Sequence, residues 1–319
     1  MGESRWTAAD APGQAGRVAV VTGANSGLGF VAARWLAQKG ARVILACRDK
    51  ERGEDAADRV RAEVAGADVR LGLLDLADLS SVREFAETFP GDGVDLLINN
   101  AGVMATPYRR TADGFEMQFG TNHLGHFALT GLLMPRLLAT DAPRVVTVSS
   151  SLHRLGKMDF SDLQGERRYQ KWPAYGRSKL ANLLFTAELQ RRADAAGATL
   201  VSAAAHPGYA STNLQGTSAR LSGSWLNEQV MRLGNAVFAQ SEEQGAWPVL
   251  YAATAPGVSG DAYAGPGTLF ETRGHPRLVG RSPAAQDTDV ARRLWEESER
   301  LTGVTYTFTP TRTERPEEP

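Results

Sequence analysis

Short apolar runs alternate with longer amphipathic segments along most of this 319-residue chain, and this alternation constrains the fold more than any other feature. The runs are nearly continuously apolar, as in parallel strands that helices cover on both faces. The predicted strands are residues 18–22, 43–46, 69–74, 95–99, 145–149 and 200–204, with a shorter one at 262–264. The predicted helices are about residues 27–39, 50–64, 79–89, 114–139, 174–196, 241–254 and 287–302. The pattern predicts an α/β protein with one doubly wound parallel sheet and right-handed crossovers.

Composition excludes several classes of protein. Lys plus Arg number 35 against 36 for Asp plus Glu, so the chain shows no excess charge for a nucleic acid, and none is expected as a partner. No apolar run approaches the roughly 20 residues that span a bilayer, so no membrane association is expected. The one cysteine, Cys47, cannot form an intramolecular disulfide. This fits a reducing compartment, and we expect a cytoplasmic protein.

The chain shows neither an internal repeat nor a break in composition, so a single domain over residues 16–309 is predicted. Residues 1–15 and 310–319 are expected to form flexible tails. A long segment at 209–240 follows a predicted strand, at the sheet edge where open α/β proteins bind ligands. Its apolar side chains recur at roughly helical spacing, which fits either a substrate lid or a helix that faces the core.

A glycine-rich loop, TGANSGLG, separates the first predicted strand from the first predicted helix. Gly23, Gly27 and Gly29 lack the Cβ atoms that would keep a pyrophosphate away from the backbone amides. The N-terminus of the following helix also favours phosphate groups. The loop therefore predicts a dinucleotide site. The other loop residues expected at this site are Asn25, Ser26 and Leu28.

Further motifs follow this loop in a fixed order. They are ACRD at 46–49, LLDLADL at 73–79, NNAG at 99–102, TNHLGHF at 121–127, VSS at 148–150, YGRSK at 175–179 and HPG at 206–208. With these motifs the chain resembles a short-chain dehydrogenase/reductase, in the branch of retinol-dehydrogenase-like and protochlorophyllide-reductase-like proteins. The resemblance implies a seven-stranded Rossmann sheet and a bound nicotinamide dinucleotide. The abundance of Arg over Lys, beside many Ala and Gly, points to a bacterial source.

The end of the second predicted strand bears on the choice between NAD and NADP. Arg48 stands where NADP-preferring family members carry arginine, and its planar guanidinium suits a 2′-phosphate. Asp49 follows directly and would favour NAD if it pointed inward. We expect NADP(H), with NAD(H) as the alternative. The resemblance implies further cofactor contacts from Asp75, Leu76, Asn99, Ala101, Gly102, Pro207, Gly208 and Thr212.

Tyr175 and Lys179 lie four residues apart in a predicted helix, so their side chains project from one face. A tyrosine has a pKa of about 10. A nearby ammonium and an oxidised nicotinamide both favour the phenolate, so we expect a lowered pKa with the cofactor bound. The resemblance makes this pair the catalytic acid/base, with Lys179 also on the nicotinamide ribose. His123 and His126 share a helical spacing, but no matching metal ligands exist elsewhere, and no metal is expected.

The resemblance also selects Ser150 to hold the substrate oxygen beside the tyrosine. Ser149 and Ser151 stay as alternatives, because a shift of one residue changes the face of the strand. Asn122 would fix a helix irregularity and bind a water that relays protons from the lysine.

These residues predict an NADP(H)-dependent enzyme that interconverts a ketone or aldehyde with an alcohol, on an apolar or aromatic small molecule. Reduction of a conjugated C=C bond by the same fold is one alternative. A non-catalytic NADP(H) sensor is another, although such regulators usually lose the tyrosine or lysine that this chain keeps. By resemblance, a homodimer or homotetramer would pair through the predicted helices at 114–139 and 174–196.

Overall fold

The computed structural model describes residues 5–208 and 241–308. These residues build one sheet in the order β3-β2-β1-β4-β5-β6-β7-β8. The strands are β1 (Val18–Thr22), β2 (Arg42–Cys47), β3 (Val69–Leu73), β4 (Leu96–Asn99), β5 (Arg144–Val148), β6 (Val201–Ala205), β7 (Tyr263–Pro266) and β8 (Pro276–Leu278). The predicted doubly wound Rossmann sheet of seven parallel strands is present, and an eighth strand, antiparallel to β7, corrects the predicted count. Strand β8 has three residues and begins with proline, so it carries no alternating pattern.

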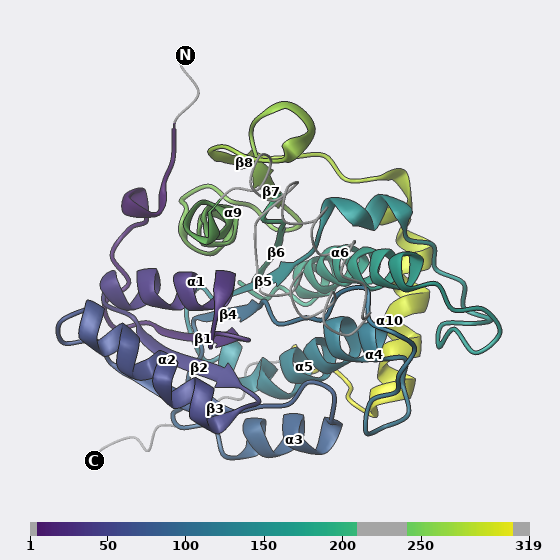
Figure 1. Cartoon of the computed structure of the whole chain (residues 1–319), viewed down its shortest axis with the longest axis horizontal. Helices are drawn as coiled ribbons and strands as arrows, with labels where there is room; N and C mark the ends of the chain where they lie inside the picture. Colours follow the sequence, from purple (N-terminus) through teal and green to yellow (C-terminus); the bar gives the residue numbers. More distant parts are fainter. Residues whose placement is uncertain (1–4, 209–240, 309–319) are drawn as a thin grey trace, which may run out of the picture.

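Helices cover both faces of the sheet (Figure 1). One face carries α1 (Gly27–Gln38), α2 (Lys50–Glu63) and α9 (Glu242–Thr254). The other carries α3 (Leu79–Glu87), α5 (Gly125–Leu137), α6 (Lys171–Ala195) and α10 (Thr288–Thr302). The predicted helix at 114–139 is instead divided. A short α4 (Met117–Phe119) and a π-helical turn at Gly120–Leu124 precede α5.

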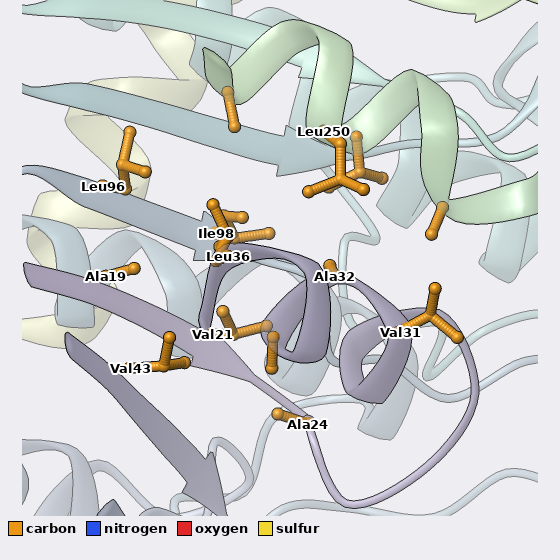
Figure 2. Close-up of a cluster of buried hydrophobic side chains, with 14 of the residues drawn as sticks. Ala19, Val21, Ala24, Val31, Ala32, Leu36, Val43, Leu96, Ile98 and Leu250 are labelled. Atoms are coloured by element: carbon orange, nitrogen blue, oxygen red, sulfur yellow. The ribbon is translucent and has the colours of Figure 1, made fainter. Parts of the chain in front are cut away.

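Alternation along each central strand divides the core between the two faces. In β4, Leu96 and Ile98 belong to the cluster that includes α1 and α9, whereas Leu97 belongs to the cluster on the opposite face. Figure 2 shows Ile98 beside Leu36 of α1, with Leu250 of α9 nearby. Because both faces of such a strand are buried, it needs apolar residues at every position, which explains the nearly continuous apolar runs.

The C-terminal part of the described chain covers the outer side of α5 and α6. Trp295 of α10 stacks on Phe185 of α6 with ring centroids 5.9 Å apart. The Tyr306 hydroxyl donates a hydrogen bond to the carbonyl oxygen of Phe127 in α5, at 2.6 Å. A Cβ at Gly131 would lie 2.7 Å from the Tyr306 ring. Pairing of two copies through these helices would therefore have to displace this cover.

Residues 5–15 do not form the flexible tail expected from the sequence. Trp6 is buried and meets the ring of Tyr251 of α9 edge-on, with centroids 5.3 Å apart. Ala8 and Ala11 belong to the same core cluster. The segment is rich in small and polar residues, so its sequence does not show that Trp6, Ala8 and Ala11 pack into the core. The expected lid at 209–240, the site residue Thr212 and the expected tail at 310–319 lie outside the described residues.

Candidate active site

A cavity of about 500 Å³ opens where the carboxyl ends of the parallel strands meet. Its walls come from the residues that follow β1 to β6, which lie far apart in the sequence. This is the edge at which open α/β sheets bind ligands. The predicted site residues that line it are Gly23, Asn25, Ser26, Gly27, Leu28, Gly29, Arg48, Asp75, Leu76, Ala101, Gly102, Ser150, Tyr175, Lys179, Pro207 and Gly208.

The glycine loop follows β1 and lines this cavity. Gly23 and Gly27 have positive φ angles of 65° and 59°, a backbone region that other residues rarely adopt. A Cβ at Gly29 would lie 2.6 Å from the Gly23 backbone carbonyl oxygen, so only glycine fits there. Ser26 precedes α1 without a side-chain cap, which leaves the first amides of the helix for an anionic ligand. The loop is therefore shaped to hold a pyrophosphate.

Two arginines lie where the cavity passes the end of β2. Arg48 and Arg52 both line it, and the Nε atom of Arg48 lies 4.0 Å from the Asp75 carboxylate. Asp49 also borders the cavity, but its carboxylate accepts a hydrogen bond from the Arg52 amide at 3.1 Å and so caps α2. Capping occupies the carboxylate that would otherwise favour a ribose 2′-hydroxyl. Arg52 is not among the predicted site residues, although its place three residues after a helix-capping Asp indicates a side chain at the start of α2, beside the end of β2.

Asn99 does not lie on the cavity, which corrects the sequence prediction. As the last residue of β4 it points into the buried layer under α5, where its Nδ2 atom donates to the Thr130 hydroxyl at 3.0 Å. Asn100 takes the place instead: it lines the cavity and its Nδ2 atom donates to the Thr22 carbonyl oxygen at 2.8 Å. The prediction took Asn99 from the NNAG motif by resemblance, and the motif alone does not say which of its two asparagines reaches the cavity.

Asn122 lies in the π-helical turn, where the sequence predicted a helix irregularity. Its side chain is fully buried and does not line the cavity. It makes two hydrogen bonds with the backbone of Val103: Oδ1 accepts from the Val103 amide at 2.8 Å, and Nδ2 donates to the Val103 carbonyl oxygen at 2.9 Å. Nδ2 also donates to the Ser178 hydroxyl at 2.9 Å. Asn122 thus ties the loop after β4 to the helix that carries Tyr175.

His126 connects this turn to the floor of the cavity. The Thr22 hydroxyl accepts hydrogen bonds from the amides of Asn100 and Ala101, so it donates its own proton to His126 Nε2 at 2.9 Å. The Nδ1 atom of His126 then donates to the Asn122 carbonyl oxygen at 3.0 Å. Burial lowers the pKa of His126 to about 4, so the ring is neutral at pH 7.

His123 does not face a metal site. Its Nε2 atom lies 2.9 Å from the Ser298 hydroxyl, and burial lowers its pKa to about 3. The described residues hold no group of three His, Cys, Asp or Glu side chains that could bind a metal ion. Cys47 is buried, and burial raises the pKa of its thiol to about 11, so it packs as a small apolar side chain.

Tyr175 and Lys179 project into the cavity from one face of α6. The Lys179 ammonium lies 5.7 Å from the centre of the Tyr175 ring and donates to the carbonyl oxygen of Val148 at 3.0 Å. The predicted lowering of the tyrosine pKa includes the effect of a bound oxidised nicotinamide, and the residues around Tyr175 do not lower it by themselves. Burial raises the pKa of Tyr175 to about 12, and burial lowers that of Lys179 to about 8. The protein alone therefore holds Tyr175 as a protonated phenol at neutral pH.

Among the three serines, Ser150 is the one that acts on the Tyr175 phenol. Its side chain lowers the pKa of the phenol and partly opposes the rise that burial causes. The Ser149 hydroxyl is buried and donates to the Lys179 carbonyl oxygen at 2.8 Å. Ser151 starts the 3-10 turn that follows β5 and is exposed. The geometry thus brings Ser150, Tyr175 and Lys179 together.

The family model for the short chain dehydrogenases matches residues 17–221, which is more than half of the chain. This chain belongs to the short-chain dehydrogenase family. The match includes the glycine loop, the serine segment after β5 and the Tyr175–Lys179 pair. Curated relatives place this dehydrogenase in a retinol-dehydrogenase-like branch. Human retinol dehydrogenase 12 is 43% identical over 293 residues, covering 91% of this chain and 88% of the relative. Mouse polyprenol dehydrogenase is 43% identical over 299 residues, with 92% and 86% covered.

Solved structures agree with this family. The dehydrogenase is 48% identical to an uncharacterised protein from Mycobacterium paratuberculosis, with a TM-score of 0.80 over 95% of this chain and all of the other. It is 27% identical to a protein from Beutenbergia cavernae named as an NAD(P)-dependent gluconate 5-dehydrogenase and solved with bound NADP. That match has a TM-score of 0.58 and covers 76% of this chain and 91% of the other.

The residues present fit the nicotinamide dinucleotide that the family binds. Gly102 borders the cavity, and a Cβ there would lie 3.0 Å from Asn122 Oδ1 and 3.6 Å from Lys179 Nζ. Glycine at this position therefore keeps the space beside the lysine free of a side chain. The glycine loop and the uncapped first amides of α1 suit the phosphates. In this dehydrogenase, Gly23–Gly29 would hold the pyrophosphate and Lys179 the nicotinamide half.

Sequence reasoning missed the cavity wall that is free for a substrate. Met104, Leu152 and Trp172 line the cavity, and Trp172 is partly exposed at the start of α6, three residues before Tyr175. All three lie in loops or at a helix start, where no periodic pattern marks a function. Among the described residues of this dehydrogenase, no helix is both long and apolar enough to cross a membrane.

Proposed function

We propose that this dehydrogenase uses NADP(H) to interconvert a ketone or aldehyde with an alcohol. The observation that carries the proposal is one cavity lined by two functional groups of residues. The first group is the glycine loop with Arg48 and Arg52, and the second is Ser150, Tyr175 and Lys179. The first group is suited to bind a phosphorylated dinucleotide, and the second to exchange a proton with a substrate oxygen.

The proposed preference for NADP(H) rests on the charges at the end of β2. Two guanidinium groups reach this part of the cavity, while Asp49 is engaged as a helix cap. A 2′-phosphate would gain charge-assisted hydrogen bonds there, which are about twice as strong as neutral ones. The B. cavernae relative was solved with NADP, which supports the same choice.

In the reduction direction, Tyr175 is the proton donor. Its phenol is protonated at neutral pH and lies beside the Ser150 hydroxyl. The Ser150 Oγ atom accepts from the Leu152 amide at 3.2 Å. Its hydroxyl proton, which acts on the Tyr175 phenol, would turn to the substrate oxygen when a substrate binds between them. Ser150 would hold that oxygen while Tyr175 gives it a proton, and alcohol oxidation would reverse both transfers.

Lys179 sets the electrostatics of this proton transfer. Its ammonium is buried and held by the Val148 carbonyl oxygen, so a positive charge stays near the phenol as the phenol loses its proton. A bound nicotinamide supplies or accepts the hydride at the substrate carbon. Asn122 and His126 hold the cavity floor in place through the contacts described above.

The substrate wall indicates an apolar molecule. Met104, Leu152 and Trp172 offer a thioether, an aliphatic chain and an indole to the cavity that Tyr175 also lines. The named activities of two relatives, on retinol and on polyprenol, concern alcohols with long apolar chains. We therefore propose a substrate whose carbonyl or alcohol group ends an apolar chain or ring.

The proposal extends to location and assembly. The buried, single Cys47 fits a reducing compartment, so we place the enzyme in the cytoplasm. A homodimer or homotetramer stays part of the proposal, and pairing through α5 and α6 would have to leave room for Trp295 and Tyr306, which pack on these helices.

Turnover with a panel of carbonyls tests the proposed function. Oxidation of NADPH and of NADH is followed with aldehydes and ketones of increasing apolar bulk. We expect a kcat/KM at least about 10-fold higher with NADPH than with NADH, a difference of roughly 1.4 kcal/mol. We also expect kcat/KM to rise with apolar chain length, because each buried methylene contributes about 0.8 kcal/mol. Tight NADPH binding without turnover on any carbonyl would contradict the proposal and favour an NADP(H) sensor.

A further inference from the structure

His153 is a buried histidine that lies three residues after Ser150 in the chain. It lies in the 3-10 turn Ser151–Leu155, only 1% exposed, and does not line the cavity. Its Nδ1 atom lies 2.7 Å from the Ser150 carbonyl oxygen, and its Nε2 atom lies 3.1 Å from the Ser282 amide. One ring therefore joins the serine segment to a segment more than a hundred residues later in the chain.

These two contacts determine the protonation state of the ring. The Ser282 amide can only donate, so Nε2 accepts and carries no proton. The Ser150 carbonyl can only accept, so Nδ1 carries the proton and donates. A protonated ring would lose the Ser282 contact, and burial lowers the pKa of His153, which favours the neutral ring. The contacts thus require the neutral ring with its proton on Nδ1.

The turn that His153 anchors also packs against the helix turn that carries Tyr175. A Cβ at Gly156 would lie 2.4 Å from the Gly176 carbonyl oxygen, and a Cβ at Gly176 would lie 2.8 Å from the Leu152 carbonyl oxygen. The two backbones touch without intervening side chains. Any shift of the turn therefore changes the placement of Ser150 relative to Tyr175.

The Ser150 carbonyl oxygen accepts twice from His153. The His153 amide donates to it at 3.0 Å, in addition to the ring at 2.7 Å. The amide bond is an ordinary turn contact that any residue at position 153 would make. The ring bond is specific to a side chain with a donor at the Nδ1 position, and it fixes the orientation of the Ser150 peptide.

We propose that His153 is a positioning residue that, through its Nδ1–H donor, holds Ser150 in line with Tyr175. This inference rests on the proposed function, because Ser150 acts there on the substrate oxygen. His153 contacts neither the cavity nor the reacting atoms. Its effect should therefore appear in the chemical step, and the binding of NADPH should not change.

Three substitutions separate the two ring contacts. Asparagine places an amide donor close to the Nδ1 position, glutamine places a polar atom close to the Nε2 position, and phenylalanine keeps the ring without either nitrogen. We expect His153→Phe and His153→Gln to lower kcat about 10- to 100-fold, as for loss of alignment near the reacting atoms. We expect His153→Asn to stay within about fivefold of the wild type, because the donor to Ser150 is retained. The Kd for NADPH should stay within about twofold in all three.

Leu155→Ala is the matched control, since Leu155 lies in the same turn, is 57% exposed and does not line the cavity. It should leave kcat unchanged. The proposal is overturned if His153→Asn loses as much kcat as His153→Phe, if His153→Phe keeps the wild-type kcat, or if kcat and NADPH binding fall together. If His153→Phe does not fold, the kcat values of His153→Asn and His153→Gln test the proposal, and equal losses of kcat in these two variants overturn it.

A spectroscopic measurement tests the inference without turnover. Long-range ¹H–¹⁵N spectra of the wild-type protein, with His153 assigned through His153→Asn, report which ring nitrogen carries the proton. We expect the proton on Nδ1 at neutral pH, and a proton on Nε2 would overturn the proposal. If the wild type shows this state yet turns over no carbonyl, the proposed function fails, while the placement of His153 stands.

Discussion

Replacing Tyr175 with phenylalanine should abolish most turnover and leave cofactor binding intact. The phenol is the proton donor in the proposed mechanism, and general acid catalysis contributes typically about 10²- to 10⁴-fold in rate. The ring itself packs in a buried position on α6, and phenylalanine preserves that packing. We therefore expect kcat to fall at least about 100-fold with a Kd for NADPH within about twofold of the wild type. Steady-state kinetics and a fluorescence titration with NADPH measure the two quantities.

Tyr108→Phe is the control for the loss of a tyrosine hydroxyl. Tyr108 is 39% exposed and does not line the cavity. Its substitution should leave both kcat and NADPH binding unchanged. A Tyr175→Phe enzyme that keeps more than about a tenth of its kcat would remove the phenol from the mechanism, because a lost general acid costs more than that.

The second large effect concerns the two arginines at the end of β2. Changing Arg48 and Arg52 together to alanine should raise the KM for NADPH about 100-fold, because hydrogen bonds to charged groups contribute about 1.5–3 kcal/mol each. NADH lacks the 2′-phosphate, so its kcat/KM should stay within about threefold. The ratio of kcat/KM for the two cofactors, measured at one ionic strength, gives the result directly.

Arg61→Ala serves as the control for this pair. Arg61 lies on α2, as Arg52 does, forms an ion pair with Asp58 at 2.6 Å and does not line the cavity. It should leave the cofactor ratio unchanged. An Arg48/Arg52 variant whose NADPH and NADH kinetics fall in parallel would show that these arginines act on stability or on both cofactors, and the preference for NADP(H) would then lack its basis.

Local sequence signals predicted the parts of the fold that repeat a pattern. Strand β1, helix α1 and the glycine loop between them were predicted because apolar runs, helical spacing and glycines coincide there. Strand β8 was missed because three residues carry no periodicity. Trp6 was assigned to a tail because its partner, Tyr251, lies far away in the sequence.

The site shows the same division between local and tertiary information. Tyr175 and Lys179 share a helix face, so their spacing alone placed them together. Asn99 and Asn100 differ by one position, and only the observed end of β4 decides which of them reaches the cavity. The direction of the Tyr175 pKa depends on burial, and no sequence pattern reports burial at that site.

The central claim is that Tyr175 and Ser150 act on a carbonyl oxygen while hydride reaches the carbonyl carbon. A conjugated enal such as cinnamaldehyde contains both a C=O and a C=C bond, so it distinguishes carbonyl reduction from enone-type reduction. The measurement is the reduction of cinnamaldehyde with NADPH that carries deuterium at C4 of its nicotinamide ring, the hydride-donating carbon, followed by NMR of the product. Our account predicts an unsaturated alcohol with the deuterium on the carbinol carbon. A saturated aldehyde with the deuterium on the β-carbon would contradict it.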